Sequence, residues 1–169
     1  MKRAFCACLL VAACLGSPAR AVVDPAGPES MEITQLLLDK SSRKLYLLHG
    51  KQAVRSYSVD LGSNPTGHKQ YQGDGRTPEG LYYITHRNPG STFFLSLGIS
   101  YPNDRDRARA RAMGRDPGGD IFIHGQPNAR PDGETLPGDW TAGCIAVTDA
   151  EIRELYAAAR IGTTVEILP

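Results

Sequence analysis

Short runs of β-favouring residues, separated by tight polar turns, constrain the fold of this chain more than any other feature of its sequence. The first three runs span residues 33–38, 44–49 and 53–59, with polar turns at 39–42 and 49–51. Runs of this length joined by such turns predict an antiparallel meander. Further β-favouring runs follow at residues 81–85, 92–97, 121–123 and 164–168.

Two segments have the pattern of a helix. Residues 104–113 contain strong helix formers but little apolar periodicity, so a surface helix and a charged loop fit them equally. A second helix is predicted after Thr148, which can form a capping box with Glu151. Its apolar residues recur at helical spacing, at Ile152, Leu155, Tyr156 and Ala159, and Gly162 follows as a stop signal. The sequence therefore predicts a mostly β fold with one or two short helices.

A long polar connection separates the third and fourth β runs. Residues 61–80 contain five glycines and two prolines. Connections of this length inside compact domains are usually functional or mobile. Its glycine-rich end, residues 73–80, is also compatible with turn formation alone.

The first 21 residues have the pattern of a secretory signal peptide. They combine a basic start, an apolar run at residues 4–15 and the small-x-small site Ala19-Arg20-Ala21. The run is shorter than the roughly 20 residues that a membrane-spanning helix needs. A rival interpretation is a lipoprotein box ending at Cys14, which would leave that cysteine lipidated. With either cut the protein is expected in the periplasm or cell envelope.

Cleavage after residue 21 defines the rest of the organisation. Residues 22–30 read as a lead-in linker and residues 31–169 as one domain of ordinary size. The cut removes three basic residues and no acidic ones, so the formal charge falls from +1 to −2, with 16 basic against 18 acidic residues. This charge offers no attraction for nucleic acid or an anionic membrane. The arginines between residues 105 and 115 are interpreted as a solvated face.

The same cut leaves Cys144 as the single cysteine. A single thiol in a secreted protein cannot form an internal disulfide, so Cys144 is either an inert core residue or a chemically active one. His124 follows the apolar run at residues 121–123. A histidine in contact with a thiol can take its proton and stabilise a thiolate.

Glycines adjoin both of these residues. Gly125 follows His124 and permits close backbone approach. Gly143 precedes Cys144, so the backbone N–H groups of Gly143 and Cys144 could face a developing oxyanion. The remaining histidines show no spacing that indicates a metal site.

Three motifs resemble the YkuD family of L,D-transpeptidase catalytic domains, over residues 33–168. That family has a His-Gly pair, a spacer and then Ser/Thr-His-Gly-Cys. Here His124-Gly125 and Thr141-Ala142-Gly143-Cys144 stand in the same order. Residues 73–80, Gly-Asp-Gly-Arg-Thr-Pro-Glu-Gly, are similar to the family's Arg-Thr-Pro-x-Gly segment before a strand.

The resemblance implies a β-sandwich-like fold and a cysteine acyltransferase that acts on peptidoglycan stem peptides without metal or cofactor. Cys144 would attack the carbonyl of the third stem residue and form a thioester, releasing D-alanine. His124 would be the proton donor and acceptor, oriented by the backbone carbonyl of Gly125. A second stem peptide, a lysine of a wall-anchored lipoprotein or water could resolve the thioester, and these alternatives stay open. A monomer is expected.

Two positions depart from the family pattern. Ala142 replaces the usual histidine before Gly-Cys, and Ala146 replaces the usual Arg or Asn two positions after the cysteine. The motifs Ile-His-Gly and Thr-Ala-Gly-Cys-Ile-Ala are similar to those of the divergent YafK-like branch, some of whose members cut the link between peptidoglycan and lipoprotein. A hydrolase with the same Cys144 and His124, and a wall-binding module with a decayed site, are therefore alternatives to a transferase.

Three further residues are candidates for substrate contacts. Trp140 lies just before the cysteine segment, Tyr101 follows a family-like segment, and Arg76 belongs to the Arg-Thr-Pro run. For all three, a structural role is the first interpretation.

Overall fold

The first three β runs form the antiparallel meander that the sequence predicts. They are strands β1 (Gln35–Asp39), β2 (Lys44–His49) and β3 (Gln52–Ser58), paired in sequence order. The computed structural model describes residues 32–131 and 133–169. The predicted signal peptide, the linker at residues 22–30 and Cys14 therefore lie outside the described residues.

The other strands extend this meander into one continuous ladder. They are β4 (Gly80–Ser91), β5 (Phe94–Ile99), β6 (Phe122–His124), β7 (Ile145–Ala146) and β8 (Thr164–Leu168). The strand order is β3-β2-β1-β8-β4-β5-β6-β7. The last strand, β8, pairs in parallel with β1 and antiparallel with the start of β4. The rest of β4 pairs with β5, β5 pairs with β6, and β6 pairs in parallel with the short β7.

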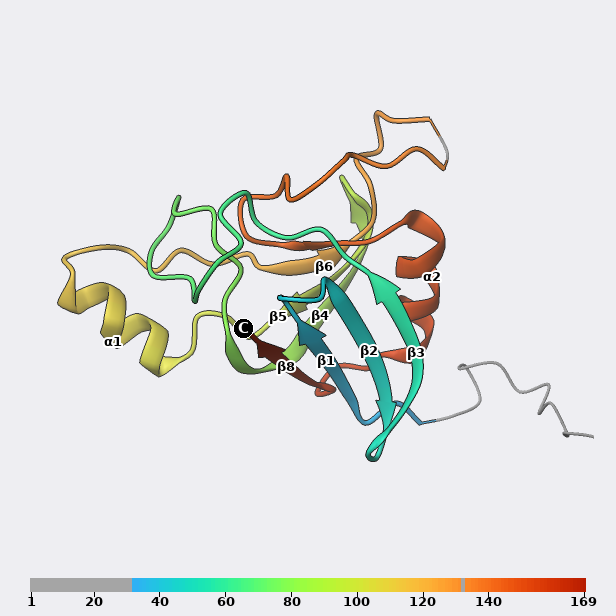
Figure 1. Ribbon diagram of the computed structural model, residues 1–169, viewed down its shortest axis with the longest axis horizontal. Coiled ribbons are helices and arrows are strands. Elements are labelled where there is room, and N and C mark those ends of the chain that lie inside the picture. The colour runs from blue at the N-terminus through green and yellow to red at the C-terminus, as the bar shows by residue number, and fades with distance from the viewer. Residues whose placement is uncertain (1–31, 132) are drawn as a thin grey trace, which may run out of the picture.

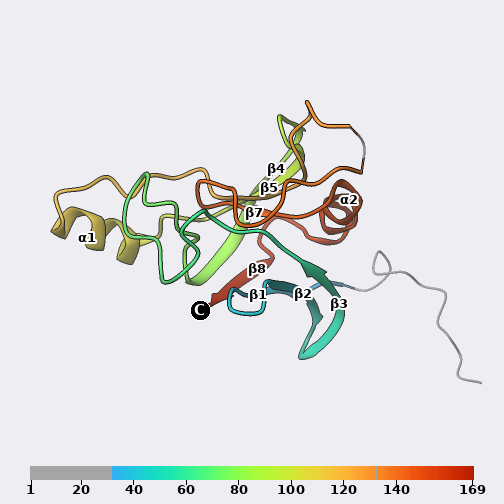
Figure 2. The same cartoon turned by 45° about the horizontal axis from the view of Figure 1, so that its top comes forward.

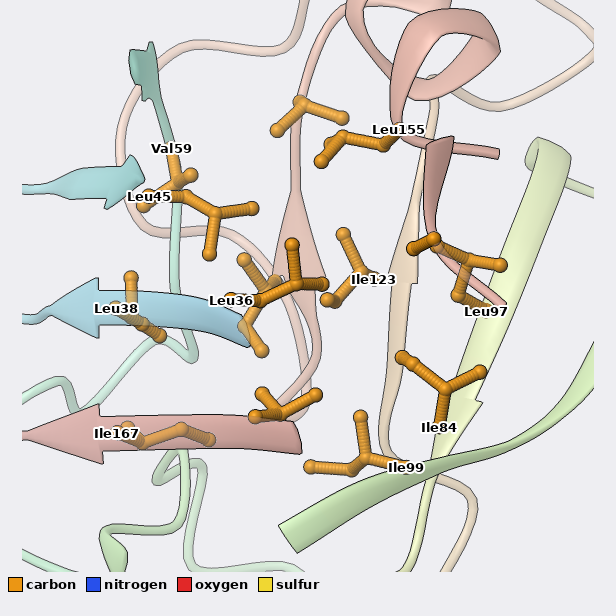
Figure 3. Close-up of a cluster of buried hydrophobic side chains, with 14 of the residues drawn as sticks. Leu36, Leu38, Leu45, Val59, Ile84, Leu97, Ile99, Ile123, Leu155 and Ile167 are labelled. Carbon is orange, nitrogen blue, oxygen red and sulfur yellow. The ribbon is translucent and has the colours of Figure 1, made fainter. Parts of the chain in front are cut away.

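The ladder folds into two layers with an apolar core between them. Figures 1 and 2 show β1, β2, β3 and β8 in one layer and β4 to β7 in the other. Leu36, Leu38 and Ile167 project from the first layer towards Ile123 and Leu97 of the second (Figure 3). The mostly β, sandwich-like fold with two short helices is therefore confirmed.

Both segments with a helical pattern form helices. The first, α1 (Asp104–Ala112), begins at Asn103, which forms a capping box with Asp106, so the charged segment is a helix and not a loop. It projects from one end of the molecule (Figure 1). The second, α2 (Asp149–Ala158), begins at the predicted cap Thr148. It packs its apolar side on β5 and β6, the strands next to the candidate site.

The largest differences from the sequence prediction are the length of β4 and the presence of β7. Strand β4 continues to Ser91, because its polar second half forms a hairpin with β5 that contains register shifts. Most side chains of that half are exposed, so it lacks the apolar alternation that marks a strand in sequence. Strand β7 has two residues and exists through its pairing with β6, a partner that local sequence does not reveal.

The connection at residues 61–80 is anchored to the sheet by a buried lysine. Lys40 is 2% exposed, and its ammonium group donates to the carbonyl oxygens of Gly67 (2.7 Å) and Thr77 (3.0 Å) and to the Glu79 carboxylate (2.8 Å). All three donors of this ammonium are thus satisfied. The polar connection becomes a specific structure that packs beside the Cys144 segment. No helix in the described part of the chain is long and apolar enough to cross a bilayer.

Candidate active site

His124 is held rigidly at the end of β6. Its side chain is buried, and Nδ1 lies 2.7 Å from the carbonyl oxygen of Gly125. A carbonyl oxygen only accepts hydrogen bonds, so Nδ1 bears the ring proton and Nε2 is left with a free lone pair. The rings of Phe93 and Trp140 lie against the imidazole, with centroid distances of 4.6 Å and 5.7 Å. The imidazole therefore has one tautomer and one orientation.

Burial also decides the charge of this imidazole. It lowers the pKa of His124 below the usual value, and the hydrogen bond to Gly125 opposes only part of this effect. His124 is therefore neutral at neutral pH, the form that can accept a proton.

Cys144 lies at the end of a tight turn that Thr141 stabilises. The Gly143 N–H donates to Thr141 Oγ1 (3.0 Å), and that hydroxyl donates to the Cys144 carbonyl oxygen (2.8 Å). Gly143 has a φ of 136°, and a Cβ there would lie 2.6 Å from the carbonyl oxygen of Arg76. Glycine is therefore required at position 143, and the Arg-Thr-Pro segment packs directly against the cysteine turn.

The thiol is held by backbone groups at the start of β6 and just before it. Sγ donates to the Asp120 carbonyl oxygen and accepts from the Phe122 N–H, each at 3.4 Å. Burial raises the pKa of the Cys144 thiol, and the Phe122 N–H and the charge of Lys69 oppose this in part. The resting site therefore contains a neutral thiol and a neutral imidazole, not the thiolate–imidazolium pair that a contacting histidine would favour.

The thiol and the imidazole line the same cavity. It has a volume of about 320 Å³, and Phe93, Asn88 and Ser96 also contribute to its walls. No hydrogen bond joins Sγ to the imidazole among the described residues, which is common in unliganded sites that tighten around a substrate. Cys144 also lines a second cavity of about 250 Å³.

Comparison with known proteins identifies this architecture. Residues 34–167 match the family model of YkuD, the L,D-transpeptidase catalytic domain. The chain belongs to the YkuD family. YafK of Escherichia coli strain K12, whose name gives it as an inferred L,D-transpeptidase, is 29% identical over 126 residues, which are 72% of this chain and 44% of YafK.

Two solved structures share the fold of this YkuD domain. The helical cell shape determining protein Pgp2 from Campylobacter jejuni is 26% identical, with a TM-score of 0.63 over 82% of this chain and 48% of Pgp2. Bd1075 of Bdellovibrio bacteriovorus is 24% identical, with a TM-score of 0.55 over 83% of this chain and 49% of Bd1075. The chain thus spans about half the length of these relatives.

The YkuD domain brings some of the predicted site residues together and separates others. His124, Gly125, Gly143 and Cys144 converge as expected. The oxyanion prediction changes in part, because the Gly143 N–H is already donated to Thr141. The Cys144 N–H has no acceptor among the described residues, so its role stays a prediction.

The three candidates for substrate contacts have packing roles in this structure. Tyr101 is buried, its hydroxyl donates to the Pro117 carbonyl oxygen (2.8 Å), and it lines neither cavity at Cys144. Arg76 contributes its backbone carbonyl beneath Gly143. Trp140 packs against the His124 ring, and its indole N–H lies near the Asp60 carboxylate without meeting hydrogen-bond geometry.

Four site residues were missed in the sequence. Phe93 covers the imidazole and also accepts the Gly125 N–H through its carbonyl oxygen. Asp120, whose carbonyl oxygen accepts from the thiol, has a φ of 55°, in the left-handed region that non-glycine residues seldom adopt. Lys69 and Gln72 line the second cavity. Only the apolar run after Asp120 hinted at any of them, because the rest depend on long-range packing.

The structure shows the surroundings of the two alanines that depart from the family pattern. Ala146 is fully buried, and its N–H donates to the Asp60 carbonyl oxygen (2.8 Å) in a bridge across β7. A longer side chain would not fit there without rearrangement. Ala142 lines the second cavity and gives it no hydrogen-bond donor from its side chain. No group of three or more potential metal ligands occurs among the described residues.

The lowered pKa of His124 predicts the acid limb of activity. A histidine with a lowered pKa remains an unprotonated base at lower pH, and activity is lost as the pH falls through that lowered value. We expect the acid limb of kcat/KM to have its midpoint below 6.5, the usual value for histidine. A pH–rate profile measures it, and a midpoint above 6.5 would indicate an ion pair in the resting enzyme.

Proposed function

We propose that this chain is a cell-envelope cysteine acyltransferase, an L,D-transpeptidase that acts on peptidoglycan stem peptides. One observation supports this most directly. The Cys144 thiol and a His124 ring with a free Nε2 line one open cavity, in a chain that belongs to the YkuD family. The predicted signal peptide at residues 1–21 would deliver the enzyme to that compartment.

The first half-reaction forms a thioester. A peptide carbonyl enters above Sγ, His124 Nε2 takes the thiol proton, and sulfur attacks the carbonyl carbon of the third stem residue. The resulting oxyanion meets the Cys144 N–H, which no described residue occupies. The C–N bond to D-alanine then breaks, and the imidazolium returns its proton to the departing amine. His124 ends the step neutral.

The second half-reaction resolves the thioester. An acceptor amine attacks the same carbonyl carbon, and its proton passes to Nε2. The C–S bond breaks, and the Cys144 thiolate recovers a proton from the imidazolium. Cys144 lines two cavities, which supports the approach of both an acyl donor and an acceptor to the sulfur.

Hydrolysis by the same Cys144 and His124 is the second candidate. It is favoured by Ala142, whose methyl group provides no hydrogen-bonding group at the position where the family usually has a histidine. Water would then resolve the thioester and give a shortened peptide. A decayed wall-binding module has less support, because Thr141 and Asp120 still hold the cysteine turn and its thiol.

Product analysis tests the proposal. The purified chain is incubated with a disaccharide-tetrapeptide, and the masses of the products are measured by mass spectrometry. A cross-linked dimer that has lost one D-alanine is the result expected for transfer, whereas tripeptide alone would assign hydrolysis. Unchanged substrate, with and without an added lipoprotein fragment, would contradict both activities.

A further inference from the structure

A buried cation lines the second cavity beside Cys144. Lys69, Gln72 and Ala142 contribute to its walls, and Asp120 and Cys144 form the boundary that it shares with the His124 cavity. The Lys69 side chain is only 4% exposed. Its position is set by the anchored connection at residues 61–80, next to the Arg-Thr-Pro segment that supports the cysteine turn.

The ammonium group of Lys69 has unused hydrogen-bonding capacity. Its single acceptor among the described residues is Asp74 Oδ1, at 2.8 Å. An ammonium group has three donors, and buried donors without acceptors are costly. Lys40, equally buried in the same part of the fold, has three acceptors. Lys40 is therefore a structural lysine, whereas Lys69 retains donors for a ligand.

The ion pair with Asp74 does not fully neutralise Lys69. Its carboxylate also accepts the backbone N–H groups of Gln70 (2.6 Å), Arg76 (3.0 Å) and Tyr71 (3.3 Å). These donors share its negative charge and would stabilise it without the lysine. The charge of Lys69 extends as far as the Cys144 thiol, where it favours the ionised form.

We propose that Lys69 binds a carboxylate of the acyl-donor peptide, carried by one of the two residues that the scissile bond joins. The inference rests on the proposed function. A tetrapeptide stem has two such groups, one on the terminal D-alanine and one on the side chain of the third residue. Asp120 lines the same cavity and would repel an anion near the boundary, so the carboxylate must lie at the Lys69 end.

Kinetics with amidated donors test this assignment. Three tetrapeptides are compared: the free acid, the C-terminal amide and the amide of the diamino acid side chain. We expect wild type to lose about ten-fold in kcat/KM on one of the amides, mainly through KM, because one charged hydrogen bond is lost. Lys69→Met should lose about as much on the free acid and should no longer discriminate between free acid and amide. The bound carboxylate is the one whose amidation slows wild type but not Lys69→Met.

Two control variants accompany this measurement. Lys69→Arg keeps the charge and should keep most of the discrimination, and Lys51→Met removes an exposed lysine in the turn after β2 and should behave as wild type. If Lys69→Met is unstable because Asp74 has lost its cation, the double variant Lys69→Met/Asp74→Asn removes both charges. The inference is overturned if a variant without Lys69 still discriminates fully between free acid and amide, or if wild type does not discriminate between them.

A binding assay separates this inference from the proposed function. Iodoacetamide labels Cys144 at alkaline pH, and a bound tetrapeptide should slow the labelling without any turnover. In wild type we expect the free acid to protect Cys144 better than one of the amides does. In Lys69→Met we expect the free acid and that amide to protect equally. If wild type processes none of the peptides but shows this selective protection, the function fails and the carboxylate site stands. Equal protection by all three peptides in wild type refutes the site.

Discussion

Cys144→Ala lowers the turnover rate by at least about 10⁴-fold and leaves the fold intact. The loss is large because no other group can form the covalent intermediate, and removing the nucleophile from such a unit eliminates most of its rate enhancement. The fold should persist because the thiol makes only two long hydrogen bonds, at 3.4 Å, both to backbone groups. Turnover of disaccharide-tetrapeptide, with the thermal midpoint measured in parallel, checks both statements.

A matched variant sharpens this test. Cys144→Ser keeps the size and the hydrogen-bonding capacity of the side chain but replaces the nucleophile by a much weaker one. Intact-mass spectrometry of wild type should show the acyl group of the donor on the peptide that contains Cys144, and neither variant should acquire it. An alanine variant that still releases D-alanine would exclude the thioester mechanism.

His124→Gln lowers kcat/KM by at least about 10²-fold, as expected for loss of a general base. Glutamine preserves much of the volume against Phe93 and Trp140, so the change tests chemistry more than packing. Because the thiol would then have to ionise unaided, the variant should recover activity as the pH rises, whereas wild type should not. Measurement of kcat/KM from acidic to alkaline pH reveals this difference.

His49→Gln is the control for this second variant. His49 is exposed at the end of β2, and its Nδ1 lies 2.8 Å from the Glu32 carbonyl oxygen, remote from Cys144 in the sheet order. It should retain wild-type rates throughout the pH range. If His124→Gln also does so, the thiol ionises through another group, and the assignment of His124 as the base is refuted.

The two variants and the Lys69 experiment address different parts of the site. Cys144 and His124 concern bond formation and proton transfer in the larger cavity, whereas Lys69 concerns recognition in the adjoining one. Asp120 and Cys144 lie where the two cavities meet. Because the charge of Lys69 also favours the ionised thiol, Lys69→Met should lose its discrimination mainly through KM and should lose less kcat than His124→Gln.

Much of the fold could be predicted from local sequence because its signals are local. The meander β1–β3 follows from short apolar runs and polar turns, and α2 follows from the Thr148 cap and its apolar spacing. The segment at α1 stayed ambiguous because its helix depends on the Asn103 cap more than on an apolar face. The second half of β4 and the two residues of β7 depend on their partner strands, so no local pattern marked them.

The sequence by itself determined which reactive groups are available, a single cysteine after the predicted signal peptide and a histidine at the end of a strand, and where glycine permits close approach. Only the tertiary structure decided their charge states and surroundings. Burial holds the thiol and imidazole neutral, Phe93 and Asp120 come from distant segments, and Lys69 differs from Lys40 only in how many acceptors surround it. Desolvation and hydrogen-bond satisfaction depend on everything within a few ångströms, which sequence order does not specify.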